Sequence, residues 1–515
     1  MIRTFVKTFG LAAVLVVASG HVGSPDTWFQ GNAGPYPVTV QVQPAGVIPG
    51  VAKIFVRVTG DAPTAVTIQT DKFDATGGAP PPEPTEPVVG DPGMYAGKLW
   101  FMTGGSNSVT VNVSGAKGHG RVVVPVVVVA YTRLGLDAPM AWGFAAMGLF
   151  LFAGLVTIVG AAVREAPLPP GEPPTDATIR RARIAMALTS VILIGLLAGG
   201  WRWWGSEDAD YERNMYKPLQ SSASVKSSAL GRILEVAIAD SSWIHRSDSA
   251  WRRLRGGTPW TPLIEDHGKL MHLFVISEDM TSFAHLHPST VDSVDFHGPV
   301  PPLPAGRYRV FADIVHESGF THTMVSSVDV PETRASPQLS VATTNLDDSW
   351  LTGTQRRTGS RITLDDGATI EWTGGGDNLA AGKSAALRFE VRNADGSPAS
   401  LEPYMGMPGH AVVQRADGSV FVHLHPMGTI SAASQMAFEM RQSGDTIRGR
   451  LGKRVSDAAV SAMSHASVVS GAVSFPYAFP KPGAYRVWVQ VKLNGKVVTA
   501  AFPLVAIAQS FKFTK

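Results

Sequence analysis

The stretch HAVVQRADGSVFVHLHP, residues 410–426, predicts a β-hairpin that carries three histidines. An apolar run follows His410, and Asp417-Gly418 is the dipeptide that two-residue hairpin turns favour. A turn at that dipeptide places His410 opposite His425, and His423 lies on the same face because side chains alternate along a strand. Imidazoles on one face of such a hairpin are about 5 to 8 Å apart, which lets their nitrogens meet one metal ion.

The same spacing of histidines occurs earlier in the chain, at an offset of 138 residues. This triad is His272, His285 and His287, and its turn, Asp279-Met280, lacks the glycine of the other hairpin. A two-residue turn places His272 opposite His287 with His285 on the same side, whereas a three-residue loop turns one strand's side chains over. The two triads hold six of the chain's 14 histidines, which favours metal binding over a cluster held by hydrogen bonds alone. The sequence leaves open whether they form one site or two.

Methionines beside the second triad bear on the identity of the metal. Met405, Met407 and Met427 flank it, and thioether sulfur suits Cu(I), whereas zinc rarely binds methionine. His267 takes the place of Met405 beside the first triad, and His322 is a weaker candidate on a later strand. We therefore predict copper as the first choice and zinc as the second, with His267 and the three methionines as further ligands. Packing in the core is the alternative role for the methionines.

The composition narrows the class of site. The chain has no cysteine, which excludes blue-copper sites, cysteine-ligated iron–sulfur clusters and disulfides. Its 44 basic and 41 acidic residues are spread along the chain, so nucleic acid is not an expected partner. No phosphate loop, Ser/His/Asp array or carboxylate pair stands out, and Glu402 is the sole candidate base near a triad. We therefore expect a binding protein and not an enzyme.

Three apolar segments predict export and membrane anchoring. Residues 1–20 have the basic, apolar and small-residue regions of a signal peptide, with an uncleaved anchor as the alternative. Residues 138–163 and 184–204 are transmembrane segments by length and apolarity. The proline-rich loop between them, 164–183, carries four arginines and is therefore expected in the cytoplasm. Both triads then lie on the periplasmic face of the bacterial cytoplasmic membrane.

The remaining segments predict three extracytoplasmic immunoglobulin-like β-sandwiches, so the fold class is mainly β with transmembrane helices. The first covers residues 21–131, where short strands alternate with Gly/Pro-rich turns, and its expected role is contact or spacing. The other two, 222–332 and 338–508, form a repeat, because each contains a triad hairpin and closes on a strand that opens Tyr-Arg-Val. The second copy has a partly helical insert at 428–475. Six prolines within 77–93 indicate a surface loop and not a strand.

The motifs around the triads resemble those of a known family. The segments AGK at 381–383, LEPYMGMPGH at 401–410 and FVHLHP at 421–426 look like the YtkA-like (FixH-related) domains of bacterial envelope proteins. The segment DHGKLMHLF at 266–274 is similar to the same motif in a variant form. The resemblance covers residues 222–332 and 338–508. The segment HVGSPD at 21–26, together with the two spans, resembles uncharacterised bacterial membrane proteins that carry such domains.

The resemblance implies an envelope location and a link to copper or to terminal-oxidase biogenesis. The implied partners are the lipid bilayer and a respiratory oxidase or a copper-trafficking protein. We therefore expect a membrane-anchored, extracytoplasmic metal-binding protein that handles copper through His/Met sites. The alternative is a structural or assembly-factor module of a membrane complex, in which the histidines are polar packing and not ligands.

Overall fold

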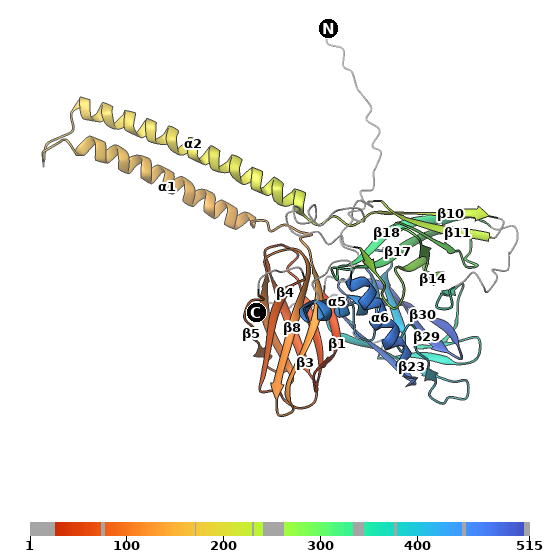
Figure 1. Cartoon of the computed structure of the whole chain (residues 1–515). Helices are drawn as coiled ribbons and strands as arrows, with labels where there is room; N and C mark the ends of the chain where they lie inside the picture. Colours follow the sequence, from red (N-terminus) through yellow and green to blue (C-terminus); the bar gives the residue numbers. More distant parts are fainter. Residues whose placement is uncertain are drawn as a thin grey trace, which may run out of the picture. The chain divides into compact units, whose positions relative to one another are not determined.

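The computed structural model describes residues 26–73, 78–169, 171–228, 231–239, 262–332, 345–374, 379–444 and 450–508. They fall into two compact units, a helical unit within residues 130–216 and a β-rich unit formed by the chain on either side of it (Figure 1). The predicted signal peptide, residues 1–20, lies outside the described residues. All of the candidate ligands belong to the β-rich unit.

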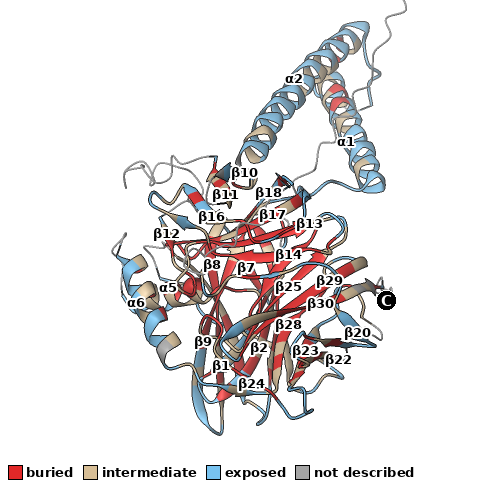
Figure 2. Ribbon diagram, turned by 90° about the vertical axis from the view of Figure 1, so that its right-hand side faces the viewer, coloured by how far each residue is buried: buried red, intermediate tan, exposed pale blue. Residues whose placement is uncertain are grey.

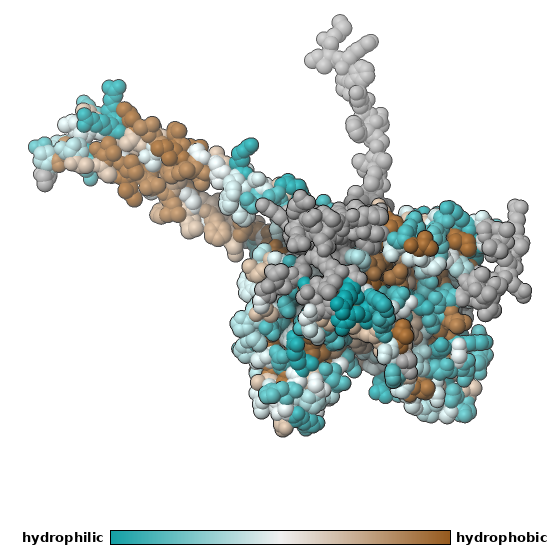
Figure 3. Space-filling model, viewed as in Figure 1, coloured by the Kyte–Doolittle hydropathy of each residue, from teal (hydrophilic) through white to brown (hydrophobic). Residues whose placement is uncertain are grey.

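The helical unit contains α1 (Ala138–Glu165) and α2 (Asp176–Asn214). Among the described residues, these are the helices long and apolar enough to cross a membrane, and Figure 3 shows the apolar residues on their surface. The predicted spans lie within them, but the loop expected at 164–183 is shorter. Because the Thr175 side chain accepts a hydrogen bond from the Thr178 N–H, it caps α2 and the helix starts at Asp176. The four arginines expected in the loop therefore lie within the two helices.

The N-terminal part of the β-rich unit is a sandwich of two antiparallel sheets. Its strands are β1 (Thr27–Ala33), β2 (Tyr36–Gln43), β3 (Gly50–Val58), β4 (Ala65–Lys72), β5 (Glu83–Pro84), β6 (Glu86–Pro87), β7 (Met94–Phe101), β8 (Gly105–Gly115) and β9 (Gly118–Val128). One sheet has the order β1-β2-β3-β7-β6 and the other the order β5-β4-β8-β9. Buried and more exposed residues alternate along β2, as expected for a strand with one face in the core. The proline-rich stretch, expected to contain no strand, contributes β5 and β6 at sheet edges, where proline is tolerated.

The first repeat follows the helical unit and also has two sheets. Its strands are β10 (Ser221–Ser228), β11 (Gly231–Ile238), β12 (Leu263–Ile264), β13 (His272–Ser277), β14 (Phe283–Leu286), β15 (Ser289–Thr290), β16 (Asp295–Pro299), β17 (Gly306–His316) and β18 (Thr321–Val330). One sheet has the order β10-β11-β16-β15. The other has the order β12-β17-β13-β14, extended by β19 (Ser349–Leu351), with β18 also paired to β17.

The second repeat has the same plan with a helical insert. Its strands are β20 (Arg356–Thr358), β21 (Arg361–Thr363), β22 (Thr369–Thr373), β23 (Ala385–Arg392), β24 (Ser400–Leu401), β25 (His410–Arg415), β26 (Phe421–Leu424), β27 (Val469–Ser470), β28 (Ala472–Tyr477), β29 (Gly483–Leu493) and β30 (Lys496–Ile507). The main sheets have the orders β20-β21-β22-β23-β28 and β26-β25-β29-β30, and β24 pairs with β27. The predicted insert contains α5 (Ala432–Gln442) and α6 (Leu451–Ser464).

The two repeats are related residue by residue. His272 pairs with Asp313 across β13 and β17, and His410 pairs with Gln490 across β25 and β29. The triad hairpin therefore packs beside the same long strand in both repeats, and Asp313 and Gln490 are counterparts.

Aromatic residues hold the two hairpin sheets against each other. Phe311 stacks on Phe421 with 4.0 Å between ring centroids, and Phe283 stacks on Trp488 at 5.1 Å. Phe311 is the counterpart of Trp488, and Phe283 of Phe421, so the two stacks are equivalent and the repeats face each other about an approximate twofold axis. Each such pair contributes about 0.5 to 1.5 kcal/mol beyond its buried area. Figure 2 shows the buried residues concentrated in these sheets.

The N-terminal sandwich is joined to the second repeat just after the triad. The Gln30 N–H donates to the Met427 carbonyl at 2.8 Å, and the Thr429 N–H donates to the Trp28 carbonyl at 3.0 Å. The Met427 side chain packs against the core of the N-terminal sandwich. The N-terminal sandwich therefore holds the segment that directly follows His425.

Candidate metal centre

Both hairpins fold in the predicted register. In the second, Val412 pairs with His423, which places His410 opposite His425, and the first has the equivalent pairs. The first turn keeps its two-residue length because Met280 adopts a φ of 60°, close to the conformation of the glycine in the other turn. The absence of glycine therefore does not change the register.

The two triads meet across the interface between the repeats and form one cluster. With His267 they bring together seven described histidines, each at most 8% exposed. Neighbouring ring centroids are 4.5 to 6.5 Å apart. The members are His267, His272, His285, His287, His410, His423 and His425. The two triads therefore lie in a single cluster of imidazoles.

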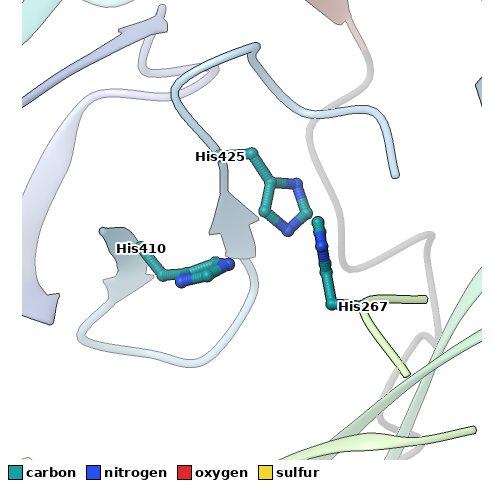
Figure 4. Close-up of side chains that lie close together, drawn as sticks. All are labelled: His267, His410 and His425. Carbon is teal, nitrogen blue, oxygen red and sulfur yellow. The ribbon is translucent and has the colours of Figure 1, made fainter. Parts of the chain in front are cut away.

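Within the described residues, two groups of three histidines have nitrogens close enough to hold a metal ion, all within 4.8 Å of one another. The first, the hairpin group, is the predicted triad His272, His285 and His287. The second, the mixed group, joins His267 of the first repeat to His410 and His425 of the second. Figure 4 shows these three rings turned toward one another.

His423 lies between the two groups and not within the second one as predicted. Its ring centroid is 4.5 Å from that of His425 and 5.3 Å from that of His272. His267 takes the place expected for His423, because the docking of the repeats brings the His267 turn over the second hairpin. His423 is therefore adjacent to both groups.

Hydrogen bonds fix the outer nitrogens of several rings. The His425 Nδ1–H donates to the Ile430 carbonyl at 3.0 Å, and the His287 Nδ1–H donates to the Asp348 carboxylate at 2.9 Å. The His423 Nδ1 faces the Asp313 carboxylate at 3.5 Å. Such bonds to the outer nitrogen orient metal-binding histidines and fix which nitrogen offers its lone pair. They leave the Nε2 atoms directed into the cluster.

The inner nitrogens of the cluster have no hydrogen-bond partners within the described part of the chain. These are the Nε2 atoms of His267, His287, His423 and His425, and both ring nitrogens of His410. A buried polar atom without a hydrogen bond costs about 1 to 3 kcal/mol, so most buried polar atoms have one. Several such atoms facing one space is the arrangement that a bound metal ion would satisfy.

One pair of facing nitrogens lies at the spacing of two ligands on one ion. The His272 Nδ1 and the His285 Nε2 are 3.2 Å apart. The His272 Nε2–H donates to the Asp266 carbonyl and the His285 Nδ1–H to the Gln490 side-chain oxygen, so both facing nitrogens carry lone pairs. This distance matches that of two ligands of one ion, since nitrogens at about 2.0 to 2.1 Å from a tetrahedral ion are about 3.3 Å apart.

Burial keeps the cluster neutral. Desolvation is the largest cause that lowers the pKa values, and the charge of Lys269 adds to it for His287 and that of His267 for His425, so that the pKa is about 3 for His287 and about 4 for His425. The pKa values of His272, His285, His410 and His423 also fall well below the ordinary value of 6.5. Neutral imidazole is the form that binds metal, so no proton has to leave at pH 7. Burial raises the pKa of Asp313 to about 7.

A cavity of about 140 Å³ reaches the cluster from the junction of the three sandwiches. His272, His423 and His425 line it, together with Asp266 and Asp313. The wall also includes residues of β1 and β9 in the N-terminal sandwich. The cavity has room for several water molecules, so a hydrated ion could reach the imidazoles by this path.

The other predicted candidates are less closely tied to the cluster. Met405 is 5% exposed and adopts a φ of 51° in a tight turn, Met407 is half-buried, and Met427 packs into the N-terminal core. The His322 Nε2 accepts a hydrogen bond from the Leu219 N–H at 2.9 Å, which uses the lone pair that a metal would need. Glu402 accepts a hydrogen bond from the Gly495 N–H at 2.9 Å.

Sequence reasoning missed the polar residues that stand behind the imidazoles. Asp313, Gln490 and Asp348 lie on other strands or segments, and Tyr404 places its hydroxyl 3.3 Å from the His285 Nδ1. One signal was available, since Asp313 and Gln490 hold the same position after the repeated Tyr-Arg-Val motif.

Comparison with family models matches residues 235–332 and 362–507 to a domain of unknown function, DUF8832. The match covers most of both repeats under a description different from the YtkA-like one. The comparison with curated proteins gives no match.

Comparison with solved structures finds weak likenesses, of which three are representative. A Corynebacterium diphtheriae protein described as membrane anchored is 7% identical, with 94% of this chain and 95% of that chain covered and a TM-score of 0.15. Titin domains Z1Z2 in complex with telethonin are 12% identical, with 57% and 95% covered and a TM-score of 0.12. The ICAM-5 D1–D4 ectodomain is 7% identical, with 94% and 84% covered and a TM-score of 0.13. TM-scores this low do not support a fold assignment, so the fold is described from the strands and sheets of this chain alone.

Proposed function

We propose that this chain is a membrane-anchored, extracytoplasmic metal-binding protein that holds copper in the histidine cluster. The observation that carries the proposal is the set of buried imidazole nitrogens that face one another without hydrogen-bond partners. Polar packing alone would pair these atoms, because leaving them unpaired destabilises the metal-free fold.

Copper remains the first choice and zinc the second. Imidazole suits both ions, and nitrogen sites bind Cu(II) more tightly than the other divalent ions of the first transition row. Methionine near the cluster would add affinity for Cu(I), which prefers soft ligands. With no cysteine in the chain, these histidines and methionines are the soft or borderline ligands that it offers.

The helical unit supports the proposed membrane anchoring and orientation. Both helices are long enough for a hydrocarbon core that about 20 residues span. The arginines at their connected ends favour the cytoplasmic side for that connection, which leaves both repeats in the periplasm. The YtkA-like resemblance suggests a respiratory oxidase or a copper-trafficking protein as the partner.

The proposed role is to hold and pass on an ion and not to catalyse a reaction. A hydrolytic zinc site needs a base beside the metal-bound water. Glu402, the base considered from the sequence, is bonded to the Gly495 backbone instead. The cavity beside the cluster offers a path by which an ion could be exchanged.

Metal analysis of the purified full-length chain tests this function. The protein is stripped with a chelator, exposed to Cu(I), Cu(II) or Zn(II), and its bound metal is measured. We expect bound copper in the wild type and a large loss in His410→Gln and His425→Gln. His297→Gln is the matched control, because the His297 side chain is 49% exposed and lies outside the cluster. A wild type that binds no metal, or a His410→Gln variant that binds as the wild type does, would favour the assembly-module alternative.

A further inference from the structure

Two tight turns beside the cluster are counterparts with different side chains. Residues 266–269 and 404–407 are each closed by two backbone hydrogen bonds between their end residues. His267 adopts a φ of 54° in the first turn, and Met405 adopts a φ of 51° in the second. The offset between the turns equals the offset between the triads. Met405 therefore holds in the second repeat the position that His267 holds in the first.

The approximate twofold relation places Met405 beside the hairpin group. His267 crosses the interface to join two histidines of the other repeat. By the same relation we expect Met405 to cross it in the opposite direction. An independent contact agrees, since the hydroxyl of the neighbouring Tyr404 lies 3.3 Å from the His285 Nδ1. The turn of the second repeat thus reaches the hairpin group.

The carboxylates beside the cluster do not separate the two groups. The Asp313 carboxylate lies 3.5 Å from the Nδ1 of His423, which belongs to neither group, and the Asp348 carboxylate accepts a hydrogen bond from the His287 Nδ1–H of the hairpin group at 2.9 Å. The difference between the two groups is therefore one of ligand type, with the His267 imidazole at the mixed group and the Met405 thioether as its counterpart.

We infer that the cluster holds two ions in unlike sites, a nitrogen site at the mixed group and a softer site at the hairpin group that the Met405 thioether completes. This inference rests on the proposed function. The nitrogen site suits Cu(II) or Zn(II), and the softer site suits Cu(I). Met405 is thereby assigned to the histidines of the other repeat and not to its own hairpin.

Competition titrations of the full-length protein with Cu(I) and Zn(II), together with X-ray absorption at the copper edge, test the inference. We expect two ions per chain and sulfur scattering in the Cu(I) form. Met405→Leu should remove that scattering and weaken one Cu(I) site by about tenfold or more, as for other losses around a metal. Zn(II) affinity at the mixed group should stay within about twofold of the wild type.

Two control variants keep the test sharp. Met407→Leu, in the same turn, should bind as the wild type. Met405→His, which copies the first repeat, should lose the sulfur scattering but keep two ions. Unchanged Cu(I) affinity in Met405→Leu, or an equal loss in Met407→Leu, would overturn the assignment while leaving the proposed function intact. A wild type that binds no ion would refute both.

Discussion

Replacing His410 by leucine should make the metal-free protein more stable. His410 is fully buried and neither ring nitrogen has a hydrogen-bond partner among the described residues. Burying an unpaired polar group costs about 1 to 3 kcal/mol, and leucine removes that cost. The change of shape costs up to about 1.5 kcal/mol, so the expected net gain is about 1 kcal/mol. Metal-dependent stabilisation should be lost at the same time.

Thermal unfolding of the chelated full-length protein in detergent measures this effect. A gain of about 1 kcal/mol in the free energy of unfolding raises Tm by about 2 to 4 °C for a domain of about 150 to 250 residues. His322→Leu is the matched control, because His322 is also buried but accepts a hydrogen bond from the Leu219 N–H, so its loss should lower Tm. A fall in Tm for metal-free His410→Leu would refute the reasoning, since it would mean that the imidazole serves the fold.

Three further outcomes are expected. The metal-free protein should lose stability as the pH falls from about 6.5 toward 4, because His425 titrates near 6.5 when unfolded and near 4 when folded, so the unfolded chain binds more protons in that window. Asp313, with its pKa raised to about 7, acts in the opposite sense, and its contribution is lost as the pH rises through 7. More histidines have lowered pKa values than carboxylates have raised ones, so Tm should be lower at pH 5 than at pH 7. An equal or higher Tm at pH 5 would contradict this. Trp488→Ala should lower the free energy of unfolding by about 3 to 5 kcal/mol. Because it separates the repeats, it should also weaken copper binding, and denaturant unfolding and copper titration measure the two effects. Unaltered copper affinity would argue against a shared cluster. A periplasm-active reporter should be active when fused after Val330 and silent after Glu172, and the reverse pattern would place the cluster in the cytoplasm.

The parts of the site that the sequence predicted are those set by local geometry. The side-chain alternation of a strand and the Asp417-Gly418 turn were enough to place His410 opposite His425, and the structure has that register. The repeated spacing then predicted the first hairpin, even though Met280 replaces the glycine of the turn. The predicted span at 184–204 lies within α2, which begins earlier, at Asp176, because apolarity marks where a membrane span begins and a cap such as Thr175 marks where a helix begins.

The assembly of the cluster could not be predicted in the same way. The union of His267 with His410 and His425 depends on how two sandwiches dock, and that docking is set by aromatic stacks between residues more than 100 positions apart. A pattern of period two describes one sheet face and carries no information about which face lies opposite.

The most direct test of the account is the number of copper ions bound per chain by the wild type and by His267→Gln. His267 belongs to the first repeat. It can therefore bind an ion together with the histidines of the second hairpin only if the two repeats share one cluster. We predict two ions for the wild type and the loss of one in His267→Gln, with the hairpin group still occupied. Equal stoichiometry and affinity in the two proteins would contradict the shared cluster and return the ligands to separate hairpins.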